Sequence, residues 1–170
     1  MCIRDRLDVV YSRNQTPVEI GNTDAEGRLL LADSLTYCQE SKIKSDFIID
    51  FATLTGAARV ALGTELPALF TNNDTLGEDI MNEGIKQIDP MWRLPLFKPY
   101  NKQLDKNNNA ISSTGSSGTG GAITAALFLN RFIDKNTNWA HVDLMAWNTS
   151  SRPGFPLSLI HISEPTRQDR

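Results

Sequence analysis

The chain has 170 residues, 40% of them hydrophobic, and a formal net charge of −3. A chain of this length can bury a sizeable core, and so small a charge gives no electrostatic reason to expect nucleic acid or a membrane surface as a partner. No apolar run approaches the ~20 residues that span a bilayer, and no secretory segment opens the sequence. We therefore expect a cytoplasmic protein.

The two ends do not match the rest of the chain. Residues 1–5 back-translate to ATG TGT ATA AGA GAC, which resembles the transposon-end adapter used to prepare sequencing libraries. The codons from residue 157 fit CTG TCT CTT ATA CAC AT, the reverse complement of that adapter. We expect residues 1–5 and 157–170 to be translated adapter and residues 6–156 to be native; uninterrupted codons at the genomic locus would refute this. The native part then holds one cysteine, Cys38, and one histidine, His141, too few for a disulfide framework or a Cys/His zinc site.

The first third of the chain predicts a strand, a helix and a second strand. "TPVEIGN" at 16–22 is typical of a short strand that ends in a Gly-Asn turn. From Asp24 to about Ser41 the apolar residues follow a helical spacing, with enough of them to predict a helix buried on most sides. "SDFIIDFATLTG" at 45–56 is a continuous apolar run, which favours a strand covered on both faces, as in a parallel sheet.

The remaining segments continue the alternation. In order, they predict a short helix over 57–63, a strand over 68–73, an amphipathic helix over 75–88, a polar loop over 101–121, a second apolar helix over 121–133 and a strand over 139–147. Strands alternating with helices predict an α/β sandwich with a mixed, mainly parallel central sheet flanked by helices.

Asp24, Glu26 and Arg28 stand where the first apolar helix begins, and two interpretations are open. In the first, Thr23 and Glu26 form a capping box and Asp24 favours the positive end of the helix dipole. In the second, the two carboxylates meet at the strand-to-helix turn and bind a divalent cation, with Arg28 holding an anion or a developing oxyanion beside it.

Five stretches in this order resemble the leucyl (cytosol) aminopeptidases, peptidase family M17. "NTDAEGRL" at 22–29 matches the signature of that family, and similar blocks follow: "DFATLTGAARVALG", "WRLPL", "GGAITAALFL" and "NWAHVDLMAW". The resemblance covers nearly all of residues 6–156 and identifies them as part of the C-terminal catalytic domain.

The resemblance implies a metal-dependent aminopeptidase that removes leucine-type N-terminal residues from peptides. Two divalent cations, Mn²⁺ or Zn²⁺, would activate a water, with Asp24 and Glu26 among their ligands. Arg28 would hold a bicarbonate and stabilise the tetrahedral intermediate. The turn formed by Thr53, Leu54, Thr55 and Gly56 would contact the substrate; the residues alone are equally compatible with a tight strand-to-helix turn.

The same resemblance implies a larger protein, a homo-oligomer that is hexameric in full-length relatives. The remaining ligands of the family, a lysine and two aspartates, together with its catalytic lysine, precede the signature, and no such cluster stands there in this chain. We therefore expect the 170-residue chain to be inactive alone, and one possibility is that it does not fold.

Other residues offer weaker candidates. The Gly-rich stretch 113–123 could cradle a phosphate and make the chain a nucleotide-binding module, although it lacks the P-loop ending. His141 is expected to be a strand residue with a satisfied hydrogen bond. Asp50 and Asp143 are candidate pocket or structural carboxylates, and Trp139 and Trp147 are candidate core or interface aromatics.

Overall fold

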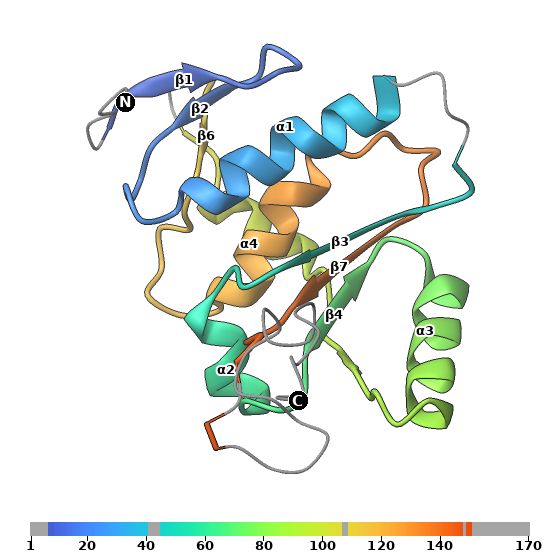
Figure 1. The fold of residues 1–170 in the computed structure, drawn as a ribbon. Helices are drawn as coiled ribbons and strands as arrows, with labels where there is room; N and C mark the ends of the chain where they lie inside the picture. Colours follow the sequence, from blue (N-terminus) through green and yellow to red (C-terminus); the bar gives the residue numbers. More distant parts are fainter. Residues whose placement is uncertain (1–6, 41–44, 107–108, 148, 151–170) are drawn as a thin grey trace, which may run out of the picture.

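A computed structural model describes residues 7–40, 45–106, 109–147 and 149–150. The proposed adapter ends, 1–5 and 157–170, lie outside these residues. The elements alternate between strands and helices as predicted (Figure 1): β1 (Val9–Tyr11), β2 (Pro17–Glu19), α1 (Glu26–Glu40), β3 (Ile48–Ala52), α2 (Gly56–Leu62), β4 (Ala68–Thr71), α3 (Asp74–Lys86), β5 (Trp92–Arg93), the 3-10 helix η1 (Lys98–Gln103), β6 (Ile111–Ser112), α4 (Gly121–Asn130) and β7 (Trp139–Asp143). None of the described helices has the length and apolar content that crossing a membrane requires.

The larger sheet has the strand order β3-β7-β4-β5. β3 runs parallel to β7 and β4 runs parallel to β5, whereas β4 and β7 are antiparallel. This confirms the predicted mixed, mainly parallel sheet. The register places Ala52, the last residue of β3, opposite Asp143, the last residue of β7. The two strands therefore end together at one edge.

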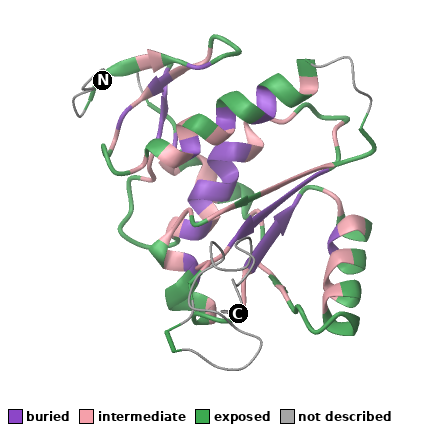
Figure 2. Ribbon diagram, viewed as in Figure 1, coloured by how far each residue is buried: buried purple, intermediate pink, exposed green. Residues whose placement is uncertain are grey.

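Helices cover both faces of this sheet (Figure 1). Because successive strand residues point to opposite faces, Leu69 and Phe70 belong to different clusters. Leu69 packs with Leu76 and Ile80 of α3, and Phe70 packs with the α4 residue Ala126. Figure 2 shows α4 as the most continuously buried helix, in agreement with the second apolar helix predicted over 121–133.

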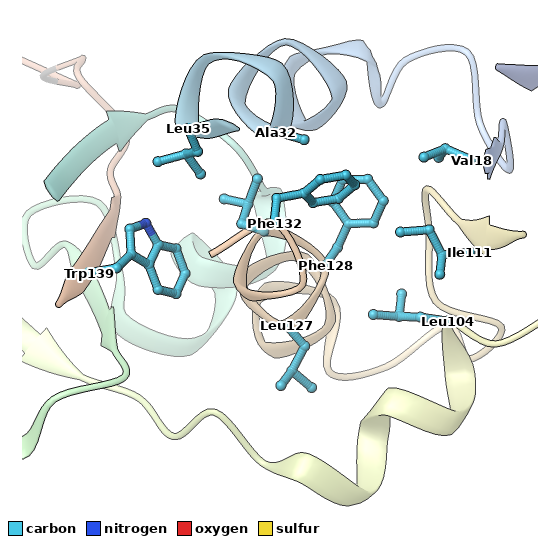
Figure 3. Close-up of a cluster of buried hydrophobic side chains, with 10 residues drawn as sticks. Val18, Ala32, Leu35, Leu104, Ile111, Leu127, Phe128, Phe132 and Trp139 are labelled. Carbon is cyan, nitrogen blue, oxygen red and sulfur yellow. The ribbon is translucent and has the colours of Figure 1, made fainter. Parts of the chain in front are cut away.

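The main core lies between α1, α4 and the sheets. Figure 3 shows Phe128 and Phe132 at its centre, with Leu35 of α1 and Trp139 of β7 on one side and Val18 of β2 on the other. Trp139 is fully buried, so its predicted place in the core is confirmed, whereas Trp147 is 55% exposed.

Two burial predictions are wrong. α1 buries only one face, formed by Arg28, Ala32, Leu35 and Thr36, and its Cys38 is exposed. One face of β3 is incompletely covered, because Phe51 is 61% exposed, and β3 is also an edge strand among the described residues. A continuous apolar run does not distinguish an edge strand from a central one.

The polar segment 101–121, predicted to be a loop, contains the end of η1 and the short strand β6. β6 pairs in parallel with β2, so that Val18 faces Ile111, and β1 adds an antiparallel strand to form a second sheet. This sheet was not predicted. It has a consequence for function because it brings the Gly-rich segment after β6 next to the acidic turn after β2.

Candidate functional site

The acidic turn between β2 and α1 is not held by a capping box. Its hydrogen bonds come from Asn22, whose Oδ1 accepts from the Asp24 amide at 3.0 Å and whose carbonyl accepts from the Ala25 amide at 3.2 Å. Among the described residues, no hydrogen bond reaches the side chains of Thr23, Asp24 or Glu26, and both acidic residues are exposed. The capping-box interpretation is therefore wrong, and the two carboxylates are available to other ligands.

Arg28 has the opposite environment, because it is only 8% exposed in the first turn of α1. Its Nη1 donates to the Ser113 carbonyl at 2.6 Å, and its buried Nε has no hydrogen-bond partner. Burial lowers the pKa of the guanidinium to about 10, because desolvation disfavours the charged form, while the nearby carboxylate of Asp143 acts in the other direction. A buried cation with an unused donor is suited to binding an anion.

The Gly-rich segment is fixed against this turn by Gly21. The Gly21 amide donates to Ser113 Oγ at 2.9 Å, and the Ser113 amide donates to the Glu19 carbonyl at 2.8 Å. A Cβ on Gly21 would overlap the Thr114 hydroxyl, so the close approach of the two segments requires glycine here.

The second predicted segment, 53–56, connects β3 to α2. Thr55 caps α2, since its Oγ1 accepts from the Ala58 amide at 3.2 Å. The amides of Leu54 and Thr55 donate to Asp143 Oδ1 at 3.0 and 3.1 Å, and the Thr55 hydroxyl donates to Asp143 Oδ2 at 2.6 Å. The tight turn therefore has both a local cap and a buried carboxylate from β7.

These segments meet around a hollow of about 300 Å³. It is lined by the acidic turn, by the 54–57 turn and by the Gly-rich segment, which includes the first residue of α4. Of the predicted site residues, it brings together Asp24, Arg28, Leu54, Thr55 and Gly56. The N-terminus of α4 adds a positive dipole to the guanidinium charge, so this hollow favours anions.

Two predicted residues do not line the hollow. Glu26 is exposed at the start of α1, and Thr53 lines a separate hollow of about 260 Å³ that also contains Thr55, Arg59 and Met145. A groove of about 980 Å³ lies between β5, η1 and the end of α4 and contains none of the predicted residues.

Two carboxylates prove to be hydrogen-bond acceptors, Asp143 buried and Asp50 half-buried. Asp143 is 2% exposed and holds the 53–56 turn. Asp50 accepts from Trp139 Nε1 at 2.8 Å and lies 2.5 Å from His141 Nδ1. His141 is fully buried, with one ring nitrogen bonded as expected and Nε2 without a partner. The sequence signal for Asp143 was its position within a predicted strand, 139–147, which did not distinguish a pocket role from a structural one.

Within the described ranges, no group of three or more His, Cys, Asp or Glu side chains could hold a metal ion. Asp24 and Glu26 therefore do not form a metal site by themselves. Among the described residues their carboxylates carry no hydrogen bonds, and exposed oxygen ligands of this kind suit divalent cations.

The family model described as "Cytosol aminopeptidase family, catalytic domain" matches residues 5–158. Curated relatives include the probable cytosol aminopeptidases of Phytoplasma mali (strain AT), 42% identical over 163 residues, and of Rhodopseudomonas palustris (strain BisB5), 50% identical over 137 residues. The alignments cover 91% and 81% of this chain but 32% and 27% of those relatives. The chain thus spans about a third of their length.

Solved structures that resemble this chain are also aminopeptidases. The cytosol aminopeptidase from Coxiella burnetii has a TM-score of 0.84 and 47% sequence identity, covering 91% of this chain and 34% of that one. A mutant of tomato leucine aminopeptidase has a TM-score of 0.81 and 38% identity, covering 86% of this chain and 29% of that one.

Proposed function

Because this chain belongs to the cytosol aminopeptidase family, peptidase family M17, we propose that it is part of the catalytic domain of a metal-dependent aminopeptidase. The whole protein would hydrolyse the bond after a leucine-type N-terminal residue of a peptide. One observation carries the proposal: the hollow in which the exposed Asp24 and the buried Arg28 face the turn formed by Leu54, Thr55 and Gly56.

Asp24 and Glu26 are proposed as metal ligands that act together with other residues of the longer protein. Their support is chemical: both carboxylates are exposed, and neither is engaged by a described residue. Two divalent cations, Mn²⁺ or Zn²⁺, supply a nucleophilic water at neutral pH and neutralise developing charge when bound.

Arg28 is proposed as the catalytic residue of this chain. Its unpartnered Nε and its position beside the N-terminus of α4 support a role in holding a bicarbonate, which would accept the proton of the attacking water. A fixed guanidinium in a desolvated site also stabilises the oxyanion of the tetrahedral intermediate more than it would in water.

The 53–56 turn is proposed to position the peptide. Gly56 and Thr53 are exposed, and the Leu54 and Thr55 backbone lies along the hollow. Holding the N-terminal residue in one orientation lowers the entropic part of the barrier. We further propose that the whole protein is a cytoplasmic hexamer, to be tested by the mass of the full-length protein in solution.

The test uses the 170-residue chain and the full-length protein, obtained by extending the coding sequence in the genome. We expect the full-length protein to hydrolyse a leucyl amide with added Mn²⁺ and the 170-residue chain to show no turnover. Clear turnover by the chain alone would contradict the incomplete ligand set. If ATP, and not Mn²⁺, raised the melting temperature of the full-length protein and no amide were hydrolysed, a nucleotide-binding role for the Gly-rich segment would replace the proposal.

A further inference from the structure

The carboxylate of Asp143 connects two segments that are far apart in the sequence. It lies at the end of β7, is 2% exposed, and accepts the Leu54 amide, the Thr55 amide and the Thr55 hydroxyl. Three donors satisfy this buried charge, and two of them belong to the backbone of the turn between β3 and α2. Losing it would leave those donors without partners.

Thr55 extends this connection into α2. Its hydroxyl donates its proton to Asp143 Oδ2. The oxygen lone pairs of the same hydroxyl are thereby oriented to accept the hydrogen bond from the Ala58 amide that caps α2. On the opposite side of the turn, the Leu144 amide donates to the Ala52 carbonyl at 3.0 Å. The turn is therefore held at both ends by consecutive residues, Asp143 and Leu144.

The same carboxylate acts on Arg28 at a distance. Leu54, Thr55 and Arg28 line one hollow, and Asp143 favours the charged form of the guanidinium. No ion pair within 4.0 Å joins Arg28 to an acidic residue in the described ranges, so this influence is electrostatic and leaves the Arg28 Nε without a partner.

We infer that Asp143 is a positioning residue for the aminopeptidase reaction, which holds the Leu54 and Thr55 backbone of the 53–56 turn in place beside the hollow. This inference rests on the proposed function. It differs from a purely structural role because the bonded groups are those proposed to meet the substrate.

Asp50 provides a matched control within the same sheet. It is a half-buried carboxylate on β3, the strand next to β7, but its partners are Trp139 and His141 in the core. Neither partner lines the hollow at the turn. Asp50→Asn and Asp143→Asn thus each remove one hydrogen-bonded carboxylate from this sheet, and only the second touches the turn.

The experiment measures kcat and KM for a leucyl amide in the full-length protein loaded with Mn²⁺. For Asp143→Asn we expect kcat/KM to fall by about tenfold or more, through both a lower kcat and a higher KM, because the turn loses its orientation. For Asp50→Asn we expect a lower melting temperature and a kcat/KM within about twofold of the wild type. Thr55→Val should resemble Asp143→Asn, whereas Thr55→Ser, which keeps the hydroxyl, should retain most of the activity.

A second readout uses hydrogen exchange of the Leu54 and Thr55 amides in the 170-residue chain. Asp143→Asn should speed their exchange and Asp50→Asn should not. Equal kcat/KM losses in Asp143→Asn and Asp50→Asn, or no loss in Asp143→Asn, would overturn the inference while leaving the proposed function intact. If Asp143→Asn does not fold, the Thr55 pair decides, and equal activity of Thr55→Val and Thr55→Ser would overturn it. A wild-type protein without aminopeptidase activity would instead refute the proposed function.

Discussion

The two turns that approach the hollow differ in how completely their polar groups are used. At the 53–56 turn, the backbone amides and the Thr55 hydroxyl are bonded to a buried carboxylate. At the acidic turn, the carboxylates of Asp24 and Glu26 are exposed and unbonded among the described residues. These donors of the 53–56 turn already have partners within the protein, whereas the carboxylates of the acidic turn can still bind a ligand.

Replacing Arg28 should have the largest effect of the changes proposed for these turns. Replacing it with methionine in the full-length protein should lower kcat by about 100-fold or more, since an oxyanion donor is lost. In the 170-residue chain the same change removes a desolvated charge but also leaves the buried Ser113 carbonyl without its donor, so we expect the free energy of unfolding to change by no more than about 1 kcal/mol. Leucyl amide turnover and urea unfolding measure the two effects. A stability loss of several kcal/mol with unchanged kcat would make Arg28 a structural residue.

Replacing Asp24 and Glu26 should weaken metal binding without changing the stability of the fold. Asp24→Asn with Glu26→Gln should change the free energy of unfolding of the 170-residue chain by less than about 0.5 kcal/mol, because both side chains are exposed and unbonded. In the full-length protein the double change should weaken Mn²⁺ binding by at least about tenfold, measured by titration calorimetry. Unchanged affinity would mean that the metals bind elsewhere.

Gly21, before the acidic turn, and Gly27, in the first turn of α1, test how closely the segments around the hollow pack. Gly21→Ala should cost about 1–3 kcal/mol in urea unfolding of the 170-residue chain, because the added Cβ overlaps Thr114 and separates the Gly-rich segment from the acidic turn. Gly27→Ala is the control: its Cβ would lie 3.6 Å from Leu54 Cδ1 in the first turn of α1, an ordinary contact. It should stabilise the helix by about 0.5–1 kcal/mol. Equal effects of the two changes would show that the close approach at Gly21 does not matter.

The sequence predicted most elements, because periodic apolar patterns and Gly or Pro boundaries act locally. It overestimated the burial of α1 and β3, since how far a helix or an edge strand is covered depends on neighbours that the pattern does not specify. It missed the sheet formed by β1, β2 and β6, because strands of two or three residues have little periodicity. The role of Asp143 also depends on a contact across 88 or 89 positions, which spacing along the chain does not encode.

The candidate site residues were predicted from the resemblance of sequence motifs to the M17 family, and less from the expected geometry of the elements. The hollow brings together Asp24, Arg28 and most of the 53–56 turn, but Glu26 and Thr53 remain outside it. Their proposed roles depend on a ligand or on protein beyond the described residues.

The most direct test of the account is the anomalous scattering of Mn²⁺ in a crystal of the full-length protein. We expect manganese peaks in direct coordination with the Asp24 and Glu26 carboxylates, next to the Arg28 guanidinium. Manganese bound away from this turn, with both acidic side chains in solvent, would contradict it.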